Sequence, residues 1–225
     1  VNREGGQRAS KLANPGQDAY FRTNKNCRLV QPRGKTMFIQ TEATPNPATL
    51  KFLPGKVVLE NGTADFRNAA EASEKSALAE ELFSIPGITG VFFGYDFVTV
   101  TKDDQDWQNL KPAILGTIME HFMAGRPVMS GAATGLAPVG DAEFFAPDDA
   151  GIVAQIKELL ETRVRPAVAQ DGGDITFRGF EGGTVFLHMK GACAGCPSST
   201  ATLKHGIQNL LKHFIPEVQQ VEQIN

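Results

Sequence analysis

Residues 184–199 read TVFLHMKGACAGCPSS, and this stretch sets two cysteines between a strand pattern and a helix pattern. Cys193 and Cys196 are two of only three cysteines in the 225 residues. A gap of two residues lets both sulfurs face one metal or cluster, or face each other as a redox pair. Pro197 suits the first position of the helix that follows, because its missing N–H would be unsatisfied there anyway.

The segments around these cysteines follow the order helix, strand, strand, helix, strand. We expect them at residues 152–164, 175–180, 184–189, 198–214 and 218–224. The first helix should end near Pro166 or at Gly172-Gly173. This α-β-β-α-β order predicts a compact α+β domain over residues 149–225.

The upstream part of the chain predicts a second small α+β domain, over residues 37–125. Strands are expected at residues 38–41, 49–52, 90–93 and 97–101, and helices at residues 76–83 and 107–123. Pro112 is expected in the first turn of the last helix, and Gly125 should end that helix. Residues 126–148 carry Pro, Gly, Ala and acids without a period, which predicts a flexible linker. The fold class is therefore two small α+β domains joined by a linker.

Residues 1–36 are basic and rich in Gly, Asn, Gln and Arg, so we expect a disordered tail. This tail has three competing origins: a transit peptide, a nucleic-acid-binding arm, or upstream sequence from a wrong start choice. We favour the last, since Met37 opens the first ordered run. A bacterial cytoplasm is then the favoured compartment, with the mitochondrial matrix as the alternative.

Composition excludes several classes of protein. No apolar run approaches the ~20 residues of a membrane span. The tail carries a net charge of +6 and the remaining chain −9, which argues against nucleic acid as the main partner. Three cysteines make no disulfide framework, so we expect a reducing compartment.

The neighbours of the cysteine pair favour reactive or metal-binding thiols. A helix N-terminus and the nearby Lys190 should lower the thiol pKa and favour the thiolate. Zinc would need two more Cys or His ligands at a short spacing, and no such pair exists. A thioredoxin-like redox site, a structural disulfide and an iron–sulfur cluster remain to be compared.

Iron–sulfur clusters take four cysteines in their commonest forms, and one chain supplies only Cys193 and Cys196. Two chains around a two-fold axis would supply all four. Such a cluster, with two bonds per subunit, would load and unload easily, as a carrier needs.

Other motifs have plainer interpretations. Asp171-Gly172-Gly173-Asp174 could be a carboxylate pair, but is more typical of a helix end, a glycine turn and a strand entry. His188 is expected as an ordinary strand histidine, and Cys27 as irrelevant to the site. The Phe144-Phe145 pair in the linker is a weak candidate for docking on a domain or partner.

Three stretches resemble the Nfu family, the relatives of the NifU C-terminal domain. They are Asp171-Gly172-Gly173-Asp174, the residues from Gly191 to Ser199, and Ile215-Pro216-Glu217-Val218. Residues 37–41, Pro45-Asn46-Pro47 and Phe92-Phe93-Gly94 are similar to the N-terminal domain of that family. The resemblance covers Met37 to Asn225.

The resemblance implies an iron–sulfur scaffold or carrier, not an enzyme, that binds a [4Fe–4S] cluster between two subunits. Only Cys193 and Cys196 carry over as ligands, and [2Fe–2S] forms stay open. The implied partners are a second copy of the chain, an upstream assembly scaffold and apo iron–sulfur proteins, with no membrane and no nucleic acid. The alternative is a thiol–disulfide oxidoreductase that uses the same pair.

Overall fold

The computed structural model describes residues 37–130, 143–194 and 197–224. The predictions for the tail, for Cys27, for most of the linker and for Cys196 therefore lie outside the described residues. None of the described helices is long and apolar enough to cross a membrane.

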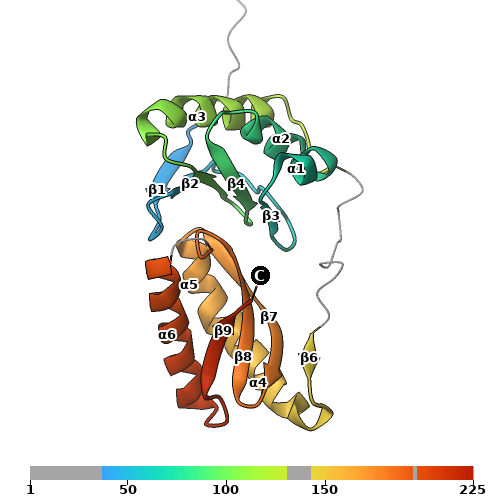
Figure 1. Cartoon of the computed structure of the whole chain (residues 1–225). Coiled ribbons are helices and arrows are strands. Elements are labelled where there is room, and N and C mark those ends of the chain that lie inside the picture. The colour runs from blue at the N-terminus through green and yellow to red at the C-terminus, as the bar shows by residue number, and fades with distance from the viewer. Residues whose placement is uncertain (1–36, 131–142, 195–196, 225) are drawn as a thin grey trace, which may run out of the picture. The chain divides into compact units, whose positions relative to one another are not determined.

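The first sheet is antiparallel, with the strand order β1-β2-β5-β4-β3, and three helices lie on one of its faces (Figure 1). The strands are β1 (Gln40–Ala43), β2 (Thr49–Leu53), β3 (Ala64–Phe66), β4 (Ile88–Phe93) and β5 (Val98–Lys102). The helices are α1 (Ala69–Lys75), α2 (Ala77–Phe83) and α3 (Trp107–Met123). Large buried side chains fill the space between the sheet and the helices, among them Phe52, Phe66, Leu78, Leu82, Phe93, Ile114 and Ile118.

The sequence predicted most of these elements, and it missed β3 and α1. Both are short, and α1 buries only Ala72, so it leaves no apolar stripe to detect. Pro112 lies inside α3, so its expected place in the first turn was wrong: Asp106 caps the helix and Trp107 opens it, five residues earlier. Gly125 follows the helix with φ of +67°, as a terminating glycine does.

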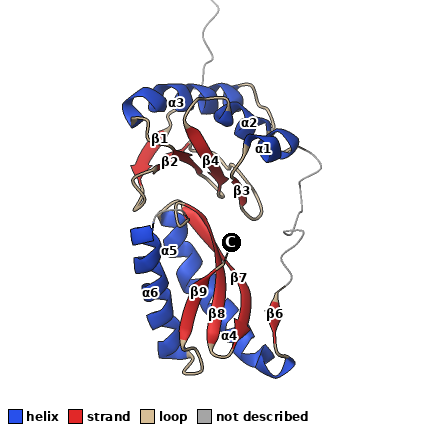
Figure 2. Cartoon of the chain, in the orientation of Figure 1, coloured by secondary structure: helices blue, strands red, loops and turns tan. Residues whose placement is uncertain are grey.

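The second sheet has the order β6-β7-β8-β9, with helices packed against it (Figure 2). Its strands are β6 (Phe144–Phe145), β7 (Gly173–Glu181), β8 (Thr184–Gly191) and β9 (Gln220–Gln223). The helical segments are η1 (Pro147–Asp149), α4 (Ala150–Leu159), η2 (Leu160–Val164), α5 (Arg165–Gln170) and α6 (Pro197–Phe214). β7 and β8 form an antiparallel hairpin, whereas β6 and β9 pair in parallel with their neighbours.

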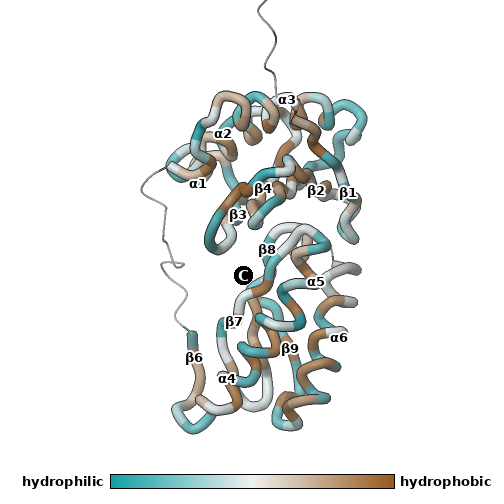
Figure 3. The backbone as a smooth tube through the Cα atoms, turned by 180° about the vertical axis from the view of Figure 1, so that it is seen from behind, coloured by the Kyte–Doolittle hydropathy of each residue, from teal (hydrophilic) through white to brown (hydrophobic). Residues whose placement is uncertain are grey.

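The predicted α-β-β-α-β order is confirmed, because α4, η2 and α5 follow one another without a break as its first helix. Hydrophobic and hydrophilic residues alternate along α6 (Figure 3). Its buried Ile207 and Leu211 reach the same core as Ile156, Leu187 and Met189. The α+β fold class is therefore confirmed.

Two features of the second sheet and its helices differ from what the sequence predicted. Phe144 and Phe145, which lie in the predicted linker range, form β6 beside β7, and the Phe144 ring lies 5.2 Å from that of Phe186. Residues 160–164 form a π-helical turn instead of α-helix. Pro166 follows this turn and has no N–H to donate, and the N–H of Arg165 reaches back five residues to the carbonyl of Leu160.

Candidate functional site

The cysteine loop, residues 192–196, connects the end of β8 to the start of α6, and residues 192–194 are described. Gly191 leaves the strand with φ of +59°, a conformation that favours glycine. The Ala194 N–H donates to the Gly191 carbonyl at 3.1 Å, and the Ala192 N–H donates to the Gly172 carbonyl at 3.2 Å. Residues 191–194 thus form a tight turn, and Ala192 also ties this turn to the residue just before β7.

Helix α6 holds the other side of the loop. The hydroxyl of Thr200, in the first turn of α6, donates to the carbonyl of Cys193 at 3.2 Å. Cys193 therefore lies between a strand end and a helix start, as the sequence predicted. Its predicted partner Cys196 is outside the described residues.

The backbone of Gly173 lies directly against the Cys193 side chain. A Cβ atom at position 173 would lie 2.5 Å from the Cys193 Sγ and 2.7 Å from the Lys190 carbonyl oxygen. Real Cβ atoms do not approach other atoms this closely, so only glycine fits here. Gly173 pairs with Gly191 across the hairpin, which fixes the distance between the two strands at this point.

Cys193 is 6% exposed and belongs to the core of the second sheet. Burial raises the pKa of its thiol to about 12, and the negative charges of Asp171 and Asp174 contribute in the same direction. The expectation of a lowered thiol pKa was wrong for Cys193, because the thiol is buried and lies near two negative charges. In this conformation the thiol is protonated at neutral pH.

The Asp171-Gly172-Gly173-Asp174 stretch is the predicted helix end, turn and strand entry. Asp171 is the C-cap of α5, Gly172 has φ of +81°, and Asp174 is the second residue of β7. The two carboxylates have separate roles, since Asp174 is buried and Asp171 is exposed.

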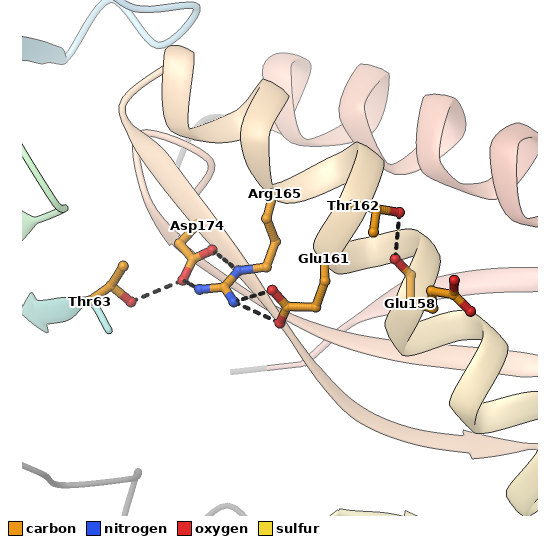
Figure 4. Close-up of polar contacts among 6 residues, drawn as sticks. All are labelled: Thr63, Glu158, Glu161, Thr162, Arg165 and Asp174. Atoms are coloured by element: carbon orange, nitrogen blue, oxygen red, sulfur yellow. Dashed lines mark hydrogen bonds and ion pairs between the residues drawn. The ribbon is translucent and has the colours of Figure 1, made fainter. Parts of the chain in front are cut away.

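Asp174 takes part in a network of charged side chains next to the loop (Figure 4). Arg165 donates from Nε to Asp174 Oδ1 at 2.7 Å and from Nη2 to Oδ2 at 2.9 Å. Nη1 of the same guanidinium donates to both carboxylate oxygens of Glu161, at 2.7 and 2.8 Å. Thr63 also donates to Asp174 Oδ2, at 2.9 Å. The hydrogen bond from Arg165 to Asp174 is the main reason that the pKa of Arg165 rises above its ordinary value.

Sequence reasoning missed Arg165. The available signal was its position, nine residues before Asp174 and directly before a proline inside a helical pattern. His188 is a strand residue of β8, as predicted, and burial lowers its pKa. His205 and His213 on α6 are exposed to solvent.

Two family models match this chain, one in its N-terminal part and one in its C-terminal part. Residues 39–125 match the family model "Scaffold protein Nfu/NifU N terminal", and residues 156–222 match the "NifU-like domain" model. A human protein, "NFU1 iron-sulfur cluster scaffold homolog, mitochondrial", is 53% identical over 190 residues, covering 84% of this chain and 72% of the human protein. This chain belongs to the Nfu family.

Other Nfu-family proteins are nearly as similar. "NifU-like protein 4, mitochondrial" of Arabidopsis thaliana is 52% identical over 192 residues, with 84% of this chain and 66% of that protein covered. A solution structure of a NifU-like protein from Saccharomyces cerevisiae is 31% identical, with a TM-score of 0.39, and covers 42% of this chain and 86% of that one. The predicted family is therefore confirmed, and its relatives are named as iron–sulfur cluster scaffolds and NifU-like proteins.

Proposed function

We propose that this chain carries a [4Fe–4S] cluster bound between two copies by Cys193 and Cys196 of each, and delivers it to apo-proteins. The main observation behind this proposal is that Cys193 lies between the end of β8 and the start of α6. Two such chains provide the four thiolates that common clusters require. The names of the relatives support the scaffold role.

The burial of Cys193 gives the loading step a physical requirement. The thiol is 6% exposed and protonated at neutral pH, whereas iron binds the thiolate. Loading must therefore expose the sulfur and release its proton. We infer that residues 192–194 move to expose the Cys193 sulfur when the cluster binds, and return to the buried arrangement when the cluster leaves.

Release would occur by ligand exchange. Thiolates of the acceptor replace those of Cys193 and Cys196 at the cluster iron, one bond at a time, and the departing sulfurs take up protons. No covalent bond of a substrate is turned over, so we propose a carrier and not an enzyme. A [2Fe–2S] form would use the same four thiolates.

The expected partners are a second copy of the chain, an upstream assembly scaffold that supplies the cluster, and apo iron–sulfur proteins that accept it. We propose that residues 37–125 and 149–225 are separate domains, and that the linker lies within residues 126–148, of which Phe144 and Phe145 join the second sheet as β6. We also propose that the first domain recognises partners. Of the two compartments considered, the names of the relatives support the mitochondrial matrix. They give no support to the bacterial cytoplasm, so we propose the former. Mapping the N-terminus of the native protein tests this choice.

The experiment is anaerobic loading with iron and sulfide, followed by transfer to an apo-enzyme that needs [4Fe–4S] for activity. We expect the loaded protein to restore that activity faster than free iron and sulfide, even with an iron chelator present. C193A and C196A should each lose loading, whereas C27A should load normally.

A loaded protein that never activates the acceptor would remove the carrier role. A protein that stays colourless but reduces a test disulfide would instead support the thiol–disulfide oxidoreductase alternative.

A further inference from the structure

The charged network beside the cysteine loop begins at the π-helical turn. Leu160–Val164 contains one residue more per turn than an α-helix, so Arg165 projects in a different direction than in an uninterrupted helix. π-helical turns of this kind occur often at functional sites. Here the turn points the Arg165 side chain at the first residues of β7 (Figure 4).

Arg165 holds Asp174 in a fixed geometry. Two hydrogen bonds run in parallel from the guanidinium to the carboxylate, at 2.7 and 2.9 Å. The Asp174 side chain is only 5% exposed, against 30% for Arg165 and 62% for Glu161. A bidentate pair with a buried carboxylate fixes orientation as well as position.

Asp174 is directly linked to the backbone that touches the thiol. It follows Gly173 in β7, and Gly173 is the residue whose backbone leaves no room for a Cβ beside the Cys193 Sγ. Across the hairpin, Asp174 pairs with Lys190 and Gly173 pairs with Gly191, the residue just before the cysteine loop. Movement at Asp174 therefore changes the surface against which Cys193 packs.

We propose that Arg165 is a positioning residue for Cys193: through Asp174 it anchors the start of β7, and so holds Gly173 against the cluster-binding thiol. The effect of Arg165 on cluster binding rests on the proposed function. Its effect on the position and accessibility of Cys193 does not, and can be measured in the protein without a cluster.

The first test measures the protein without a cluster. In a chain where C27A and C196A leave Cys193 as the single cysteine, iodoacetamide labelling of that thiol is followed by mass spectrometry. R165Q should label about tenfold faster than the parent, because local opening of the loop becomes easier. R165K keeps the charge but cannot make the two parallel hydrogen bonds, so its labelling rate should lie between those of R165Q and the parent.

The matched control is K204Q. Lys204 forms an ion pair with Glu222 at 2.8 Å in the same part of the fold, and its side chain is 27% exposed, close to that of Arg165. K204Q should label at the parent rate. Urea unfolding of every variant gives the fraction unfolded under labelling conditions.

The proposal is overturned if R165Q labels at the parent rate. It is also overturned if R165Q speeds labelling only as far as its greater unfolded fraction accounts for. If R165Q does not fold, the labelling rates of R165K and E161Q are compared with the parent rate by the same criteria. E161Q removes one of the two carboxylates that hold the guanidinium.

The second test measures the cluster in a chain that keeps all its cysteines. Residues behind the metal ligands typically change metal affinity by about 10–100-fold, so R165Q should lose iron to a chelator faster by a factor in that range. R165K should be intermediate and K204Q unchanged. Equal rates of iron loss in R165Q and wild type would contradict the proposal for the loaded state.

Failure of wild type to bind any cluster would remove the proposed function. It would leave the labelling result as an independent test of Arg165.

Discussion

At the residue scale, position 173 has no room for any side chain beside Cys193. Alanine would place a Cβ 2.5 Å from the Cys193 Sγ and 2.7 Å from the Lys190 carbonyl oxygen, so the thiol or the hairpin must move. We expect G173A to lower the free energy of unfolding by about 1–3 kcal/mol, as overpacked cores do, and to impair loading.

The control for this change is G206A. Gly206 lies in α6, and among the described residues nothing outside its chain neighbours and its own helix backbone comes within 4 Å of the added Cβ. Alanine should therefore stabilise by up to about 1 kcal/mol through helix propensity. Urea unfolding and iron content after loading measure both variants. A G173A protein as stable and as well loaded as wild type would show that the contact with Cys193 has no consequence.

The thiol of Cys193 makes stability depend on pH. Its pKa rises from an ordinary 9.0 to about 12 on folding, so the folded state holds this proton more tightly than the unfolded state. The resulting stabilisation is complete below pH 9 and is lost as pH rises toward 12. C193A should therefore lose less stability than wild type between pH 8.5 and pH 10.5.

Urea titrations of the protein without a cluster, at both pH values, measure this difference. Identical losses in the two proteins would show that the thiol is not protected in solution.

These residues also show which features of the site could be predicted from the sequence alone. The identity of Cys193 as a candidate ligand follows from two cysteines at a spacing of three in a strand-to-helix loop. The pKa of its thiol does not follow, because burial and the approach of Asp171 and Asp174 depend on how the loop folds back on β7. Arg165 escaped notice for the same reason: its partner Asp174 is brought to it by the hairpin.

At the scale of elements, Ser76 joins two helices of the first sheet. It is the C-cap of α1 and the N-cap of α2, where its side chain accepts from the Ala79 N–H at 3.1 Å. Its hydroxyl also donates to the buried carbonyl of Val128 at 2.6 Å. S76A leaves both groups without this partner, and we expect a loss of about 1–2 kcal/mol in the free energy of unfolding.

S73A is the matched control, because Ser73 is exposed and its hydroxyl donates to the Ala70 carbonyl within the same helix at 2.9 Å. It should change stability by less than about 0.5 kcal/mol. Urea unfolding measures both variants. A loss in S73A equal to that in S76A would contradict the special role of the shared cap.

Elements with a long apolar stripe were the ones that sequence predicted well. α3 was predicted over its full extent, because buried Leu110, Ile114 and Ile118 recur on one face. α1 and β3 were missed because each buries one residue and draws its stability from neighbours. The π-helical turn was missed because a proline in a helical pattern predicts a helix end, whereas here the helix continues past it with a changed hydrogen-bond register.

At the scale of the whole molecule, the proposed function gives each chain half of a four-thiolate site. A cluster shared by two chains would couple loading to dimer formation, and loss of the cluster to separation. In that proposal the buried Cys193 thiol is the form without a cluster, and loading would require its exposure and deprotonation.

The most direct test of the shared cluster is native mass spectrometry of the anaerobically loaded protein, prepared from a mixture of chains with and without a mass tag. We expect a species of two chains with one cluster of about four iron and four sulfide. Tagged and untagged chains should mix in it, and C193A should not form it. A cluster found mainly on single chains, or a loaded dimer that persists in C193A, would contradict the account.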